Sequence, residues 1–115
     1  MEEQRMFGNK LNKISKMIEK NQAEKLEQLL KNKDQTIVLA AIDGLGQCTG
    51  DTAFNALVPL ILSTDVQVRI HAIKALGVMG LPKARTFLLH QKDKETDKDV
   101  LAALEEALKK ISVKV

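Results

Sequence analysis

The sequence predicts an all-α fold, a right-handed α-solenoid of about three and a half helical hairpins. The main observation is a repeat: Asp34, Asp65 and Asp97 begin the same pattern at a spacing of 31 or 32 residues. An apolar residue follows each Asp at the third, eleventh and fourteenth positions, namely Ile37, Leu45 and Cys48; Val68, Leu76 and Met79; and Val100, Leu108 and Ile111. A unit this short cannot bury its own apolar face, so we expect the units to stack.

Composition supports the same fold. The chain has 115 residues, of which 44% are hydrophobic but only 3% aromatic, with no Trp and no Tyr. This balance suits helices that pack through aliphatic side chains. We expect one domain over 1–115, divided into a divergent N-terminal repeat at about 3–33, two full repeats at 34–64 and 65–96, and a C-terminal half-repeat at 97–112 that closes the stack.

The first repeat matches the others only loosely. Leu11, Ile14 and Met17 take the apolar positions of a first helix, and Ala23, Leu26 and Leu30 follow as a second helix. Lys10 stands where the next two repeats have the small residues Ala41 and Ala72. A degenerate terminal repeat of this kind is typical of a capping unit.

The second repeat predicts a first helix over 36–48, a turn at 49–51 and a second helix over 52–63. Ala53, Leu57, Leu60 and Ile61 recur at helical spacing and should point inward. Asp34 and Asp65 are placed to cap the first helices of their repeats, and Asp51 is placed to cap the second helix.

The third repeat repeats this arrangement. Gly77 and Gly80 should loosen the chain after the first helix, and Pro82 suits the start of the second. That helix should carry Ala84, Phe87, Leu88 and Gln91 on one face. The charged segment 92–98 then predicts a charged connection, most simply a solvated loop that can include the frayed end of this helix.

The last unit predicts a single helix over about 99–112, with Val100, Leu104, Leu108 and Ile111 on one side. Glu105 takes the position held by Ile42 and Ile73 in the earlier repeats. A charge at a position that faces the next repeat indicates that the stack ends here.

In the third repeat, the segment from Asp65 to Arg69 is followed by Ala72, 75–77 (Ala-Leu-Gly) and Gly80. Through these residues the repeat resembles HEAT-like repeats of the short class, which have about 31 residues and were first associated with phycobilisome-lyase-type proteins. The resemblance covers 34–111 well and 9–33 loosely. It implies that the first helices form the convex side and that the second helices line a concave, ligand-facing side. It also implies that Arg69 ties adjacent repeats together.

Side chains suited to catalysis are few. His71 and His90 should lie on opposite surfaces, Cys48 takes a buried repeat position, and these three residues do not form a zinc pattern. Gly44, Gly46 and Gly50 lack the flanking strand and the Lys-Ser/Thr of a phosphate loop. The sequence therefore predicts no enzyme activity, no metal and no cofactor.

The favoured function is that of an adaptor that binds a protein, as a peptide or a partner helix, on the concave face. The rotation that turns the core residues inward exposes nine candidate contact residues: Lys25, Gln28, Asn55, Val58, Pro59, Leu62, Thr86, Leu89 and His90. The apolar members could instead be contacts between neighbouring second helices, and the sequence favours neither reading.

Two alternatives stay open. The net charge of +3 resides in residues 1–33, where Lys10, Lys13, Lys16 and Lys20 could meet the phosphates of a nucleic acid. Interspersed Glu residues and the absence of Trp and Tyr argue against it. The resemblance also suggests a bilin lyase-like or phycobiliprotein-associated factor. We expect a monomer, because Lys10 and Glu105 place charges at the two ends, and a cytosolic location, because neither a secretory signal nor a membrane span is visible.

Overall fold

The computed structural model describes the backbone of residues 2–111 and side chains from Asn9 onward. In chain order, it contains α1 (Glu2–Glu19), α2 (Ala23–Gln28) with the 3-10 helix η1 (Leu29–Lys31), α3 (Gln35–Leu45), α4 (Asp51–Leu57) with the 3-10 helix η2 (Val58–Leu62), α5 (Val66–Met79), α6 (Ala84–Lys94) and α7 (Lys98–Lys110). Residues 1 and 112–115 of the expected domain, and with them the expected helix end at Ser112, lie outside the described residues.

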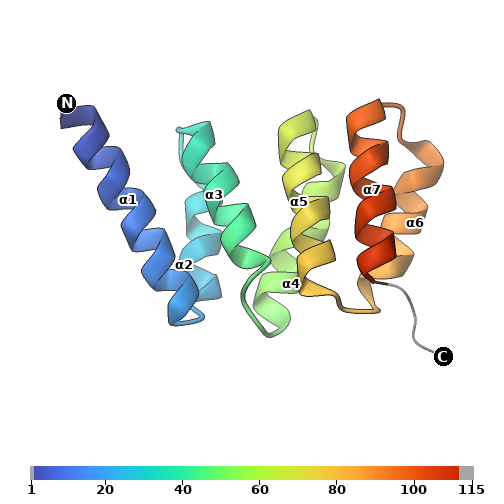
Figure 1. The fold of residues 1–115 in the computed structure, drawn as a ribbon, viewed down its shortest axis with the longest axis horizontal. Coiled ribbons are helices and arrows are strands. Elements are labelled where there is room, and N and C mark those ends of the chain that lie inside the picture. Colours follow the sequence, from blue (N-terminus) through green and yellow to red (C-terminus); the bar gives the residue numbers. More distant parts are fainter. Residues whose placement is uncertain (1, 112–115) are drawn as a thin grey trace.

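The helices form two layers. The first helices of the repeats, α1, α3, α5 and α7, stand side by side in chain order, and α2, α4 and α6 lie behind them (Figure 1). Each hairpin therefore packs against the hairpins before and after it, which confirms the all-α solenoid. None of the helices in the described part of the chain is long and apolar enough to cross a membrane.

Aspartate side chains begin the first helices, as predicted for Asp34 and Asp65, and Asp97 begins α7 in the same way. The Asp34 carboxylate accepts a hydrogen bond from the backbone N–H of Thr36 at 3.0 Å, and Asp65 and Asp97 each accept two such bonds at the starts of α5 and α7. These bonds satisfy N–H groups that have no partner within the helix. The recurring Asp is therefore a helix cap, and it sets where each repeat starts.

The predicted cap at Asp51 is wrong. Gly50 takes the N-cap position of α4 with φ of 97°, a left-handed conformation that favours glycine. Asp51 is the first helical residue, and its carboxylate lies 3.1 Å from Lys83 Nζ in the next repeat. Its negative charge still lies at the N-terminus of a helix, where the helix dipole favours it.

The core is continuous through the stack. The largest fully buried side chains are almost all Leu and Ile from successive repeats, among them Leu26, Ile37, Ile42, Leu45, Leu57, Ile73, Leu76, Leu88, Leu104 and Ile111. Each side chain of this size contributes roughly 1.5–3 kcal/mol on burial. Glu105, by contrast, is exposed on α7.

Glycine allows the first helices to approach closely. A Cβ atom on Gly46 would lie 2.8 Å from Cα and Cβ of Ala75, and one on Gly77 would lie 3.0 Å from the same atoms of Ala107. Gly77 does not loosen the chain as predicted, because it lies inside α5 and faces α7. The turn comes at Gly80, whose left-handed conformation (φ 69°) ends the helix.

The second helices differ in form from the prediction. The helix expected over 52–63 is α-helical only to Leu57 and continues as the 3-10 helix η2, which contains Pro59. A 3-10 helix has three residues per turn, so residues three apart, such as Pro59 and Leu62, lie in one row. Pro82 lies in a turn, two residues before α6 begins at Ala84.

Candidate functional site

A groove lies between η2 and α6 in the layer of second helices. Its volume is about 430 Å³, and we call it the η2–α6 groove. It is lined by Val58, Pro59, Ile61, Leu62, Thr86, Phe87, His90, Gln91 and Lys94. Ile61 and Gln91 are the buried members of this set and form the floor, whereas the others are partly or fully exposed around it.

Large apolar side chains remain exposed around this groove. Leu62 is 61% exposed and Phe87 is 43% exposed, although their chain neighbours Ile61 and Leu88 are buried in the core. The Phe87 ring packs edge-on against the buried ring of Phe54, with a centroid separation of 6.2 Å. Exposed apolar side chains clustered on a concave surface commonly mark a binding site.

The structure brings together five of the nine predicted contact residues. Val58, Pro59 and Leu62 from η2 and Thr86 and His90 from α6 all line the groove. Val58 is partly buried, so it serves both the groove and the core.

The other four predicted residues are exposed but lie outside the groove lining. Lys25 and Gln28 belong to α2, Asn55 to α4, and Leu89, which is 41% exposed, to α6. The groove also contains Phe87 and Gln91, which the sequence predicts on one face of this helix together with Ala84 and Leu88. Phe87 lies at the edge of that face, and its side chain is exposed, whereas the other three are buried.

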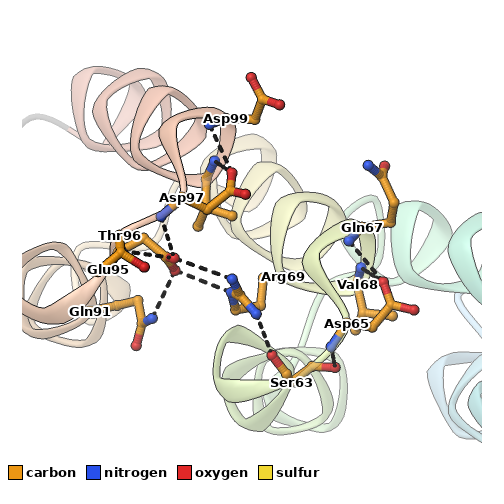
Figure 2. Close-up of polar contacts among 11 residues, drawn as sticks. Ser63, Asp65, Gln67, Val68, Arg69, Gln91, Glu95, Thr96, Asp97 and Asp99 are labelled. Carbon is orange, nitrogen blue, oxygen red and sulfur yellow. Dashed lines mark hydrogen bonds and ion pairs between the residues drawn. The ribbon is translucent and has the colours of Figure 1, made fainter.

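A buried ion pair joins the C-terminal ends of the two groove walls. Arg69, on α5, donates one hydrogen bond to the carbonyl oxygen of Ser63, which follows η2, at 2.8 Å. It donates two more to the carboxylate of Glu95, which follows α6, at 3.1 and 3.2 Å (Figure 2). One guanidinium group therefore fixes the ends of both walls relative to each other. This geometry agrees with the tying role expected for Arg69.

Glu95 is buried, contrary to the prediction of a solvated connection over 92–98. Helix α6 ends within this segment at Lys94, and most of the segment is exposed, but the Glu95 side chain is only 3% exposed. Besides the two bonds from Arg69, its carboxylate accepts bonds from the Gln91 side chain at 3.0 Å and from the backbone N–H groups of Thr96 and Asp97 at 3.2 and 3.1 Å. Five donors thus converge on two oxygen atoms.

These contacts decide the charge state of Glu95. Burial by itself would raise the pKa of the carboxyl group. The hydrogen bonds from Gln91, from the Asp97 backbone and from Arg69, together with the positive charge of Arg69, outweigh burial and lower the pKa below its ordinary value. Glu95 is therefore held as a carboxylate.

Gln91 connects this cluster to the groove. Its side-chain NH₂ group must face Glu95, because a carboxylate can only accept hydrogen bonds. Its Oε1 atom consequently points away from Glu95 (Figure 2), and this buried oxygen has no hydrogen-bond partner among the described residues. Leu60 and Leu29 take the equivalent position in the two preceding repeats, so the polar group is particular to this one.

The remaining titratable candidates lie elsewhere. His71 Nδ1 lies 2.8 Å from Asp43 on the neighbouring helix α3, in the layer of first helices. Cys48 is buried, and burial raises the pKa of its thiol. Within the described part of the chain, no three His, Cys, Asp or Glu side chains are placed to hold a metal ion.

The four lysines of the nucleic-acid alternative, Lys10, Lys13, Lys16 and Lys20, are exposed on or just after α1.

Two layers of short antiparallel helices with an apolar groove in one layer define an α-solenoid with a potential binding surface. The family described as HEAT repeats matches residues 23–109, which is well over half of the chain. The chain therefore belongs to the HEAT repeat family. HEAT repeats commonly mediate interactions between proteins. The comparison with curated proteins gave no match.

Proposed function

We propose that this protein is a non-enzymatic adaptor that binds a peptide or a helix of a partner protein in the η2–α6 groove. The observation that carries the proposal is the group of exposed apolar side chains around a buried floor. Leu62 and Phe87 provide opposite apolar walls, and Ile61 closes the floor between them. An amphipathic segment can cover these side chains and remove them from water.

The groove is held in shape before a partner arrives. Arg69 binds Ser63 at the end of one wall and Glu95 at the end of the other, through side chains that are largely buried. A partner therefore meets two walls whose spacing is already set, and little conformational entropy is lost on binding. The groove lies in the layer of second helices, the side that we expect to be concave.

The rim favours a partner that carries negative charge. Lys94 is the one ammonium group among the groove-lining residues, and none of these residues is acidic. An acidic side chain beside the apolar residues of the partner would pair with it. Such a rim contact mainly sets orientation and association rate, whereas the apolar contacts supply most of the affinity.

A peptide selection tests the proposal without a known partner. Random 12-residue peptides would be displayed on phage and selected on the purified protein, and the selected peptides would then be titrated against Leu62→Glu. Leu62 is 61% exposed, so this change should leave the fold intact while it places a charge in the groove. We expect binding to fall by at least about tenfold, because the loss of a well-packed apolar anchor costs roughly 2 kcal/mol or more.

Val78→Glu is the matched control. Val78 is 59% exposed and lies on α5, outside the η2–α6 groove, so the substitution adds the same charge to a similarly exposed apolar site. Selected peptides should bind this variant as they bind the unmodified protein. The proposal fails if no peptide is enriched, or if the enriched peptides bind Leu62→Glu and Val78→Glu equally well.

A further inference from the structure

We propose that two copies of this protein associate through α1, with residues 2–7 of each copy seated in a pocket of the other. The pocket lies at the N-terminal end of the stack, has a volume of about 180 Å³ and is separate from the η2–α6 groove. We call it the α1 pocket, and it is lined by Lys10, Lys13, Ile14, Met17, Leu29, Asn32 and Ile37.

The α1 pocket lies where the first repeat departs from the others. Ala41 and Ala72 are fully buried at equivalent positions of the next two repeats, whereas Lys10 is exposed. Ile14 is buried at the floor of the pocket, and Lys13 is exposed beside it. None of the residues that line the pocket is acidic. The pocket therefore suits an apolar side chain that is accompanied by negative charge.

The sequence of the first turns of α1 carries both features. Glu2 and Glu3 are acidic, and Met6 and Phe7 follow them at a distance of four residues. This spacing places an acidic and an apolar residue on the same side of a helix. The sequence-based expectation of a monomer treats Lys10 as a charge that opposes association. In the proposed dimer its charge is paired instead.

These first turns of α1 extend beyond the second repeat. Helix α1 has 18 residues, whereas its neighbour α3 has 11. The contact between Ile18 and Gly44 places Gln35, the first residue of α3, level with about Asn9. Residues 2–7 cannot turn back into the pocket of their own molecule, because they continue the helix that forms one wall of it. A second copy is therefore needed to bring this segment to the pocket.

Two α1 helices that cross in opposite directions fill both pockets at once. Glu2 and Glu3 lie in the first turn, and Lys10 and Lys13 follow about two to three turns later, so each acidic end meets the lysines of the other copy. Gly8 lies between the two charged parts, and without a side chain it allows the helices to approach closely.

The position of α1 in the stack permits this approach. It stands at one end of the row of first helices, where a second copy can reach it without crossing another repeat (Figure 1). Both copies use the same surface, so the contact closes as a dimer with two-fold symmetry and does not continue into a chain.

Sedimentation velocity of the full chain from about 1 to 100 µM tests the proposal, because interfaces of modest size can associate in this range. We expect the unmodified protein to shift from monomer to dimer, and to do so less at high salt, which screens the ion pairs. Glu2→Lys/Glu3→Lys reverses the charge of the segment, and Lys10→Glu/Lys13→Glu reverses the charge of the pocket. Each variant should self-associate at least about tenfold more weakly, since like charges then oppose each other.

A mixture of the two variants separates pairing from unfolding. An equimolar mixture should form the dimer again, because each reversed segment meets a reversed pocket and each unmodified segment meets an unmodified pocket. Mixing cannot repair a protein that has failed to fold. Lys109→Glu/Lys110→Glu makes the same change at exposed positions on α7, at the far end of the stack, and should associate as the unmodified protein does.

A monomer at every concentration would overturn the proposal, as would a dimer that either variant leaves unchanged or that mixing does not restore. Lys10 and Lys13 are also candidates for contact with nucleic acid. Salt-sensitive binding of a labelled DNA oligonucleotide by a protein that stays monomeric, if lost in Lys10→Glu/Lys13→Glu, would assign these lysines to that role and overturn the dimer.

Discussion

Glu95→Gln should destabilise the protein strongly, although the two side chains have nearly the same size. The carboxylate accepts five hydrogen bonds, two of them from Arg69, and its side chain is 3% exposed. An amide at this position brings its own N–H groups toward other donors and leaves Arg69 without its counter-ion. Arg69 is itself only 15% exposed, so water can replace little of what is lost.

The expected loss is about 3 kcal/mol, the lower end of the range for removing one partner of a buried ion pair. That is a large fraction of the roughly 5–15 kcal/mol by which a typical domain is stable. It corresponds to a fall in Tm of roughly 10 °C for a chain of this length. The measurement is urea unfolding followed by circular dichroism, because the chain has no tryptophan to report on folding.

The pH dependence of the free energy of unfolding provides a second, independent test. The folded-state pKa of Glu95 is lowered, so the stabilisation from its ionised form is complete above the ordinary glutamate pKa of about 4.3. It is lost as the pH falls through the folded-state pKa. The difference in unfolding free energy between the unmodified protein and Glu95→Gln should therefore be largest at neutral pH and shrink in acid.

Glu105→Gln is the control, since it makes the same chemical change at an exposed position on α7. It should alter stability by no more than about 0.5 kcal/mol. If Glu95→Gln is as stable as this control at pH 7, or if its deficit does not change with pH, the buried cluster does not stabilise the fold as argued.

Three further predictions concern packing, capping and reactivity. Gly46→Ala should lower the free energy of unfolding by about 1–3 kcal/mol, because the new methyl group would lie 2.8 Å from the Ala75 backbone. At an unhindered helical glycine the same change raises Tm, so a gain in Tm would contradict the close approach of α3 and α5. Asp65→Ala should cost about 1–2 kcal/mol by removing the cap of α5, whereas Asp65→Asn should retain most of the stability, both measured by thermal unfolding. Cys48 should react with a thiol reagent far more slowly than it does in urea, because burial raises its pKa and shields the sulfur; equal rates with and without urea would refute its burial.

The periodic features of the sequence were sufficient to predict the stack. Repeated apolar positions predicted which side chains are buried, as at Leu45, Leu76 and Leu108, because helical spacing places them on one face wherever the helix packs. The aspartates that begin each repeat predicted the helix starts, because a cap acts on its own neighbours in the chain. These are local interactions, and local interactions can be read from one segment at a time.

The groove depended on packing between repeats. Phe87 lies at the edge of the buried face of α6, so how much of its side chain is exposed depends on how closely η2 packs against α6. The sequence of residues 84–94 carries no information about that distance. The 3-10 form of η2 aligns Pro59 with Leu62, whereas a continued α-helix, with more residues per turn, would have left Leu62 short of a full turn from Pro59 and out of that row.

The burial of Glu95 shows the same limit of sequence reasoning. In the sequence it stands in a charged run that is typical of a solvated loop. In the structure it meets Arg69, 26 residues earlier in the chain, and this pair in turn orients Gln91 beside the groove. The positions of the first helices and their aspartate caps follow from short-range spacing, whereas the groove and its buried ion pair exist only where residues from separate repeats are brought into contact.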